Sequence, residues 1–325
     1  MYGVNGINEY LRERFGKKVV KLSLDAGFTC PNRDGKCGTG GCIFCSEEGS
    51  GDNAGRGSIG EGIKSQLALM SGKWPDASHI VYFQSHTNTY APAESLKRIY
   101  AEALSYSEQA DIVGLAIATR PDCLPEETLE LLSELNEKTF LWVELGLQTI
   151  HEESAAFNNR GYGLKVFDEA FESLRKRNIK TVVHLLFGLP KAVERGKLLR
   201  ESREEMLASL DYVCGKMPFG LKLHMLNVVK NSPLALNYPD YVPFESPEEY
   251  VNLVCDAIER IPHEITIHRL YGDVPQRILL APEWAYKKRT VLNGIEKELA
   301  RRGSFQGCLL QAEAHSQSGP KRLSL

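Results

Sequence analysis

Short apolar runs alternate with longer amphipathic segments along the whole chain. Seven runs rich in β-branched and aromatic residues predict strands, at residues 17–26, 79–87, 111–121, 139–149, 179–190, 220–229 and 263–270. The segments between them repeat apolar residues at helical spacing, which predicts helices at 59–73, 93–108, 125–138, 164–178, 198–216, 246–261 and 284–303. Repeated strand–helix units favour a parallel sheet. The polar segment 311–325 has no periodicity and is predicted to be a disordered tail.

The predicted strands have one apolar and one polar side. Residues two apart in a strand share a face, so Val143 and Leu145 lie on one side of the fourth run, and Glu144 and Gln148 on the other. The polar sides of the other runs hold Lys21, Ser23, Asp25, Gln84, His86, Arg120, His184, Lys222 and His224. A closed eight-stranded barrel fills its interior with branched apolar side chains. The polar faces therefore indicate an open or wide barrel whose lumen holds a polar ligand.

Composition and charge narrow the class of protein. The chain has 325 residues, 42% of them hydrophobic and 25% charged, with a net charge of -3, which is the balance of a globular protein with a large core. The N-terminus lacks the apolar core of a signal peptide, and no apolar run approaches the roughly 18 residues of a membrane span. We therefore expect a cytoplasmic protein without a membrane partner. Thiols stay reduced there, so clustered cysteines indicate metal or redox chemistry rather than disulfides.

Four of the eight cysteines lie in one glycine-rich loop directly after the first predicted strand. They are Cys30, Cys37, Cys42 and Cys45, with the spacing C-x6-C-x4-C-x2-C. Barrel enzymes place their catalytic groups at this end of the strands. A single C-x-x-C pair and a backbone able to wrap closely around a large ligand favour an iron–sulfur cluster over a zinc ion. Two alternatives stay open: zinc held by all four thiolates, and a redox dithiol formed by Cys42 and Cys45.

The loop CPNRDGKCGTGGCIFC resembles the cluster loop of the radical S-adenosylmethionine (SAM) enzymes, in the branch that includes the catalytic subunit of Elongator. Within that branch it is similar to a bacterial family with the pattern C-P-N-R-D-G followed by G-G-C-x-F-C, from about residue 6 to 293. The resemblance implies a partial, open (β/α)6-type TIM barrel over residues 1–230. It also implies a C-terminal extension, 231–310, that completes the barrel and covers the substrate side.

The same resemblance assigns the cofactors. A [4Fe-4S] cluster is expected on Cys30, Cys42 and Cys45, with one iron left open for SAM, while Cys37 departs from the family pattern as a bystander or substitute ligand. The residues implied in SAM binding are Gln84, Ser85, Thr87, Asn88, Arg120, Glu144, Gln148, Arg160, Gly188 and Pro190. Tyr162 stands where the family is expected to have a histidine. Taken singly, Arg160 has the alternative role of a surface ion-pair former, and His184, His224 and His268 that of hydrogen-bonded barrel residues.

The chemistry and partners also follow from the resemblance. A reduced cluster gives one electron to SAM, and the resulting 5′-deoxyadenosyl radical takes a hydrogen atom from the substrate. An electron donor such as flavodoxin or ferredoxin is therefore expected. Kinship with the Elongator subunit suggests a tRNA wobble uridine as substrate, with basic stretches at 12–18, 174–178 and 287–302, and a small-molecule substrate is the alternative. Residues 230–270 are expected to form a lid facing the substrate and the final strand.

Overall fold

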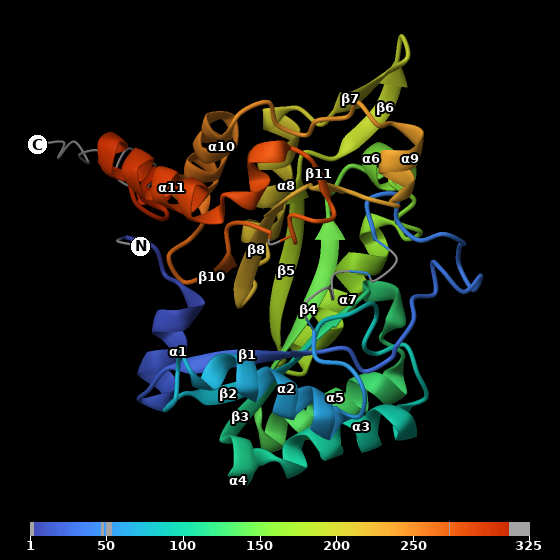
Figure 1. Ribbon diagram of the computed structural model, residues 1–325, viewed down its shortest axis with the longest axis vertical. Helices are drawn as coiled ribbons and strands as arrows, with labels where there is room; N and C mark the ends of the chain where they lie inside the picture. The colour runs from blue at the N-terminus through green and yellow to red at the C-terminus, as the bar shows by residue number, and fades with distance from the viewer. Residues whose placement is uncertain (1–2, 47–48, 50–53, 273, 312–325) are drawn as a thin grey trace, which may run out of the picture.

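Seven parallel strands form one curved sheet, a half-barrel (Figure 1). The computed structural model describes residues 3–46, 49, 54–272 and 274–311. The strands lie in the order β1 (Val19–Leu24), β2 (Ser78–Phe83), β3 (Ile112–Thr119), β4 (Phe140–Gln148), β5 (Lys180–Phe187), β8 (Gly220–Met225) and β10 (Thr266–Arg269). The predicted partial TIM barrel is confirmed, and its seventh strand, β10, lies within the predicted run 263–270. The predicted tail lies, apart from residue 311, outside the described residues.

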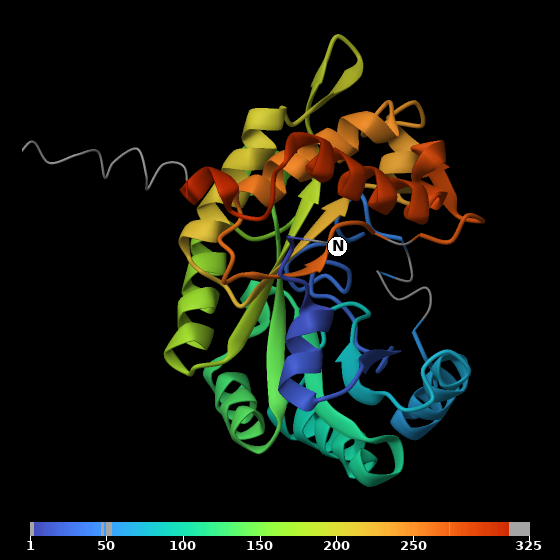
Figure 2. The ribbon, with the colours of Figure 1, turned by 90° about the vertical axis from the view of Figure 1, so that its left-hand side faces the viewer.

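Helices cover the outer face of the sheet (Figure 2). The helices that follow its strands are α2 (Ile59–Ser71), α3 (Ala93–Ser105), α5 (Glu126–Lys138), α7 (Leu164–Lys176), α8 (Arg203–Gly215) and α10 (Pro247–Arg260), and α11 (Lys288–Arg302) packs on α10. All seven predicted helices are present. None of the described helices combines the length and hydropathy needed to cross a bilayer.

The prediction that a helix begins at residue 198 is wrong. Residues Lys197–Arg200 form strand β7, which pairs with β6 (Pro190–Glu194) in a hairpin that projects from the body in Figure 1. Arg195 and Gly196 both have positive φ angles, 50° and 79°, as a two-residue hairpin turn requires. Helix α8 begins later, after a capping box in which the Ser202 hydroxyl accepts from the Glu205 amide.

The apolar side of the strands packs against the helices, as predicted. Leu22, Leu24, Val143, Leu145 and Leu147 are at most 1% exposed and belong to one large core between sheet and helices. Burial of each of these side chains contributes about 1.5–3 kcal/mol. The polar sides of the same strands are thereby left to face the lumen of the half-barrel.

Helix α1 (Ile7–Phe15), which was not predicted, closes the lumen at the amino ends of the strands. The preceding segment joins the edge strand β10, where the Ile267 amide donates to the Asn5 carbonyl (2.8 Å). The helix then crosses to β1 and packs on an aromatic cluster, in which Tyr10 lies 5.1 Å from Phe219 and Phe15 lies 5.5 Å from Phe140 between ring centroids. One end of the lumen is therefore filled by side chains.

Shorter elements, most of them not predicted, surround the other end of the barrel. They are η1 (Pro121–Cys123), α6 (Glu152–Phe157), α9 (Pro233–Asn237), η2 (Glu283–Tyr286) and an antiparallel pair formed by β9 (Val228–Val229) and β11 (Leu279–Ala281), while α4 (Ser107–Ala110) precedes β3. Most follow the carboxyl ends of the sheet strands, where catalytic groups gather in barrel folds.

Candidate active site

A cavity of about 320 Å³ lies at the carboxyl ends of the sheet strands. Its wall combines the cysteine loop with the polar sides of the strands, including Gln84, Arg120, Glu144, Gln148, His184 and Lys222. The prediction that these polar faces enclose a lumen is therefore confirmed. The volume lies at the lower end of the range of small-molecule sites.

Three of the four loop cysteines line this cavity. Cys30, Cys42 and Cys45 belong to its wall, whereas Cys37 is exposed outside it and lies 3.7 Å from Nη2 of Arg120. A hydrogen bond from the Cys42 thiol lowers the pKa of Cys45 to about 7 and raises that of Cys42 well above its ordinary value. Across the described part of the chain, no three Cys, His, Asp or Glu side chains are arranged around a single metal ion.

The buried side chain of Asn32 organises the cysteine loop. Its Nδ2 donates to the Asn159 carbonyl (2.5 Å) and lies 3.8 Å from Cys42 Sγ, while the backbone carbonyl of Asn32 accepts from the Gly41 amide (2.8 Å). The backbone at Gly38 approaches so closely that a Cβ there would lie 2.1 Å from Asn32 Oδ1. The loop thus wraps around the side-chain amide of Asn32 and packs on the segment that follows α6.

Two arginines enclose the ring of Tyr162. The guanidinium carbons of Arg120 and Arg160 lie 4.8 and 4.7 Å from its centroid, within the range of cation–π contacts. Arg120 also pairs with both carboxylate oxygens of Asp122 (2.7 and 2.9 Å) and donates to the Arg160 carbonyl (3.0 Å). The Tyr162 hydroxyl donates to the Gly146 carbonyl (2.5 Å). Tyr162, which stands where the family is expected to have a histidine, therefore holds the two arginines against the end of β4.

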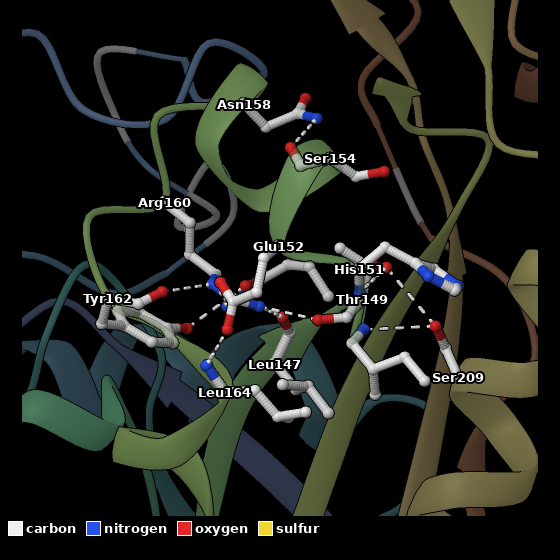
Figure 3. A network of polar contacts seen from close by, with 12 residues as sticks. Leu147, Thr149, His151, Glu152, Ser154, Asn158, Arg160, Tyr162, Leu164 and Ser209 are labelled. Carbon is white, nitrogen blue, oxygen red and sulfur yellow. Dashed lines mark hydrogen bonds and ion pairs between the residues drawn. The ribbon is translucent and has the colours of Figure 1, made fainter. Parts of the chain in front are cut away.

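Arg160 is only 2% exposed, so it does not act from the surface (Figure 3). Its Nη1 donates to the carbonyls of Leu147 (2.9 Å) and Thr149 (2.7 Å), its Nε to the Tyr162 carbonyl (2.9 Å), and its Nη2 pairs with Glu152 (3.5 Å). A guanidinium has five N–H donors. These contacts use four of them and leave one for a ligand.

Gln148 ends β4 in a strained conformation. Its φ is 64°, a left-handed value that non-glycine residues rarely adopt and that is common at functional sites. Its Nε2 would lie 2.6 Å from a Cβ placed on Gly146, and both residues line the cavity. Glycine at position 146 therefore leaves the room that the Gln148 amide occupies.

The other residues implied in SAM binding divide into two groups. Gln84 and Thr87 line the cavity, whereas Ser85 and Asn88 are buried outside its wall, and the Asn88 Nδ2 donates to the Ala118 carbonyl (2.9 Å).

Gly188 and Pro190 also lie outside the wall of the cavity. The Gly188 carbonyl accepts from the Tyr241 hydroxyl (2.8 Å), and that of Pro190 accepts from Asn158 Nδ2 (2.6 Å). The wall instead contains Leu186, which precedes Gly188 by two positions, and Phe44 of the C-x-F-C ending. Sequence reasoning missed both, although the lumen face of the fifth run includes Leu186.

Glu144 is the centre of a hydrogen-bonded network at the floor of the cavity. It accepts from the Tyr82 hydroxyl (2.7 Å), His184 Nε2 (2.9 Å) and Trp142 Nε1 (2.9 Å), and it forms a buried ion pair with Lys222. Burial alone would raise the pKa of Glu144, but the charge of Lys222 and the hydrogen bond from His184 hold it well below its usual range.

The histidines near the floor differ in whether their ring nitrogens have hydrogen-bond partners. Burial lowers the pKa of His184 to about 4, so at neutral pH it is a neutral imidazole that donates to Glu144. His224 and His268 each keep one buried ring nitrogen without a partner in the described structure, Nε2 and Nδ1 respectively. The expectation of a hydrogen-bonded barrel histidine therefore fits His184, which contacts Glu144, and His268, which contacts Thr266, but His224 has no hydrogen bond among the described residues.

Comparisons with known proteins agree with this geometry. Residues 33–197 match the Radical SAM superfamily, and residues 218–301 match the Radical_SAM C-terminal domain. The chain is 43% identical over 311 residues to YtqA of Bacillus subtilis (strain 168). This match covers 94% of this chain and 92% of YtqA.

Two further proteins, a human sequence and an archaeal structure, match the chain at lower identity. Elongator complex protein 3 of Homo sapiens is 26% identical over 206 residues, 61% of this chain and 35% of that protein. The structure of archaeal Methanocaldococcus infernus Elp3, with an N-terminus deletion, has a TM-score of 0.65 at 18% identity, and the match covers 89% of this chain and 64% of that one. The present chain thus corresponds to part of each Elongator protein, and the structural match shows a shared fold.

Proposed function

Because this chain belongs to the Radical SAM superfamily, we propose that its cavity holds a [4Fe-4S] cluster on Cys30, Cys42 and Cys45, with SAM beside it. Superfamily membership implies these two cofactors and supports an enzymatic function. The observation that carries the assignment is that these three thiols line one cavity together with the polar strand ends, whereas Cys37 lies outside it.

The chemistry of the loop fits such a cluster. Cysteine thiolates are the usual ligands of iron–sulfur clusters, and the guanidinium groups of Arg33 and Arg120 both favour the thiolate of Cys45. A structural zinc site would use four protein ligands, and the exposed position of Cys37 does not support that alternative. A dithiol of Cys42 and Cys45 agrees with their mutual hydrogen bond, but it gives no role to Cys30 in the same wall.

When bound, the reduced cluster would supply the electron that cleaves SAM to methionine and a 5′-deoxyadenosyl radical, which takes hydrogen from the substrate. The chain's own residues hold and shield the reactants. Gln84 and Thr87 can bind the methionyl amino group, and the free N–H of Arg160 can bind its carboxylate. The side chain of Gln148 can bind the ribose. Phe44 and Leu186 offer an apolar wall for the adenine ring.

The other implied SAM contacts receive less support. Ser85, Asn88, Gly188 and Pro190 lie outside the cavity wall, so their contribution would be to hold the backbone around it. Arg120 and Glu144 line the cavity, but each is paired with a charged neighbour. The extension 231–310 is proposed to cover the substrate side, which agrees with Gly272 and Val274 lining the cavity.

Reductive cleavage of SAM tests the proposal. The purified protein, reconstituted anaerobically with iron and sulfide and reduced with dithionite, should convert SAM to methionine and 5′-deoxyadenosine, measured by mass spectrometry. Gly146→Ala should lower the rate by about tenfold or more, because the added methyl displaces the Gln148 amide from the cavity wall. Gly215→Ala is a matched control, since a methyl there meets open space. Failure of the native protein to form 5′-deoxyadenosine would exclude the proposed chemistry.

For the substrate we infer tRNA, on the kinship with Elongator complex protein 3 and on the positions of surface cations. Of the three basic stretches, 12–18 and 174–178 lie toward the amino ends of the strands, away from the cavity. They are partly neutralised by ion pairs such as Lys17–Asp111 and Arg177–Glu126.

A different group of cations lies nearer the cavity. Lys230 follows the cavity residue Val229 and donates its amide to the Ile278 carbonyl (2.8 Å), next to exposed Arg277. Lys287 is the N-cap residue of α11, and Arg289 lies in the first turn of that helix. No ion pair involves any of these four cations within the part of the chain that the structure describes.

Binding of unfractionated tRNA should depend on these cations. We expect Arg277→Gln combined with Arg289→Gln to weaken binding and to reduce the slope of log affinity against log salt concentration by about two. The matched control, Arg175→Gln with Arg177→Gln, removes the same charge at the other end of the barrel and should leave binding unchanged. Equal loss in both double variants would argue against this surface.

Mass spectrometry of tRNA nucleosides tests the substrate itself. Cells lacking the protein should lose one modified nucleoside and accumulate its precursor. An unchanged nucleoside profile would exclude tRNA and favour the small-molecule alternative.

A further inference from the structure

We propose that the floor of the cavity is an anion-binding site, in which Arg269, Lys222 and His224 hold a carboxylate-like group of the substrate. This inference rests on the proposed function and deepens it, because it names the charge of the substrate that the radical would attack. Arg269 is not among the residues predicted from the sequence to bind a ligand.

The charges that line the cavity are unequal. Among the described residues of its wall, five side chains are basic, Arg33, Arg120, Arg160, Lys222 and Arg269, and one is acidic, Glu144. Most of the five already have a partner: Arg120 pairs with Asp122, Arg160 with Glu152 and Lys222 with Glu144, and Arg33 donates to the Ser46 carbonyl. The guanidinium of Arg269 has no hydrogen-bond or ion-pair partner among the residues that the structure describes.

Arg269 faces the network at the floor. It is the last residue of β10. Burial is the main cause of the pKa shifts of Lys21, Lys222, Tyr82 and His224, and the positive charge of Arg269 also lowers all four pKa values. Lys21 adds a second cation, stacked 4.8 Å from the centroid of the Tyr82 ring. Among the described residues, the floor therefore carries the cations Lys21, Lys222 and Arg269 against the one carboxylate of Glu144.

An unused hydrogen-bonding atom points to the same place. His224 lines the cavity, its Nε2 is buried, and no described residue contacts that nitrogen with a hydrogen bond. Burial and the charge of Arg269 hold the pKa of His224 well below its usual value, so the ring is neutral at pH 7 and has one N–H to donate. A buried polar atom without a partner is costly in a folded protein, and a bound anion would satisfy it.

Charge and shape together define the ligand. A cationic group would be repelled from the floor, and a neutral group would leave the guanidinium uncompensated, which is unfavourable in a partly buried site. The planar fork of an arginine binds carboxylate or phosphate through two parallel hydrogen bonds. Because the floor and the cysteine loop belong to one cavity, a substrate anchored by its anionic group would direct its neighbouring C–H bonds toward the loop.

Titration of the reconstituted protein with small probes tests this site. We expect sodium acetate to bind the native protein and Arg269→Lys. Its affinity for Arg269→Gln should be at least about tenfold lower, because a charge-assisted hydrogen bond is lost. Acetamide, a neutral analogue of the same shape, should bind none of them measurably. Calorimetry gives the affinities, and Arg175→Gln, an exposed change outside the cavity, is the matched control and should bind acetate like the native protein.

Each outcome decides the proposal. Tighter binding of inorganic phosphate than of acetate, lost in Arg269→Gln, would support the anion site and indicate a phosphate-bearing substrate. Equal binding of acetate and acetamide, or equal acetate binding by native protein and Arg269→Gln, would overturn it. Cleavage of SAM by the native protein without selective anion binding would remove the anion site alone. Selective anion binding without SAM cleavage would remove the proposed function and leave a basic pocket.

Discussion

Each of the single variants Cys30→Ser, Cys42→Ser and Cys45→Ser should contain less than about one iron atom per chain after anaerobic reconstitution, against about four in the native protein. The reason is that a cluster with three protein thiolates cannot lose one and remain stable. Cys37→Ala should keep the full iron content, because that thiol is exposed outside the cavity. Iron and sulfide analysis with optical spectra gives the result.

The same series separates the alternatives. A zinc site on all four cysteines requires that Cys37→Ala lose metal as fully as the others do. If Cys42 and Cys45 form a redox dithiol, none of the four substitutions should change the iron content. Retention of iron in Cys30→Ser together with its loss in Cys37→Ala would show that the ligand assignment is wrong at those two positions.

The second large effect is expected at the floor of the cavity. Glu144→Gln should lower the free energy of unfolding by about 3–5 kcal/mol, because it leaves the buried ammonium of Lys222 without a counter-charge. Combining it with Lys222→Met should restore part of the loss, since neither charge then remains alone. Urea denaturation of the three proteins measures this. An additive loss in the double variant would contradict a coupled pair.

The pH dependence of this effect has a defined sign. The folded-state pKa of Glu144 lies below its unfolded value of about 4.3, so the ionised carboxylate stabilises the fold above that pH. The contribution is lost as the pH falls below the unfolded value toward the folded one. The difference in stability between the native protein and Glu144→Gln should therefore be constant near neutrality and shrink below about pH 4. A difference that grows on acidification would contradict the assignment.

Much of the fold could be predicted because its strands are strongly patterned. Period-two alternation in runs such as 139–149 separates the helix-covered face from the lumen face, and the structure keeps that separation. Prediction failed where a local conformation overrides the pattern. Residues 198–200 continue an apolar periodicity into the next helix, but the turn at Arg195 and Gly196 folds them back as a strand.

The site was less predictable because side-chain direction depends on single backbone angles. The segment after β2 was correctly placed at the cavity, yet Ser85 and Asn88 do not belong to its wall. Arg269 was missed for a related reason. A register irregularity in β10 between Ile267 and Arg269 breaks the alternation from which the facing residue would be deduced, and Arg269 lines the cavity beside the floor.

The central claim is that one iron of the cluster has no protein thiolate and binds SAM. Pulsed EPR of the reduced, reconstituted protein with SAM labelled with ¹⁵N in its amino group and ¹⁷O in its carboxylate tests it most directly. We predict hyperfine coupling from both labels to the cluster, absent with unlabelled SAM. A protein whose metal positions are all filled by its own side chains, with no coupling to either label, would contradict the account.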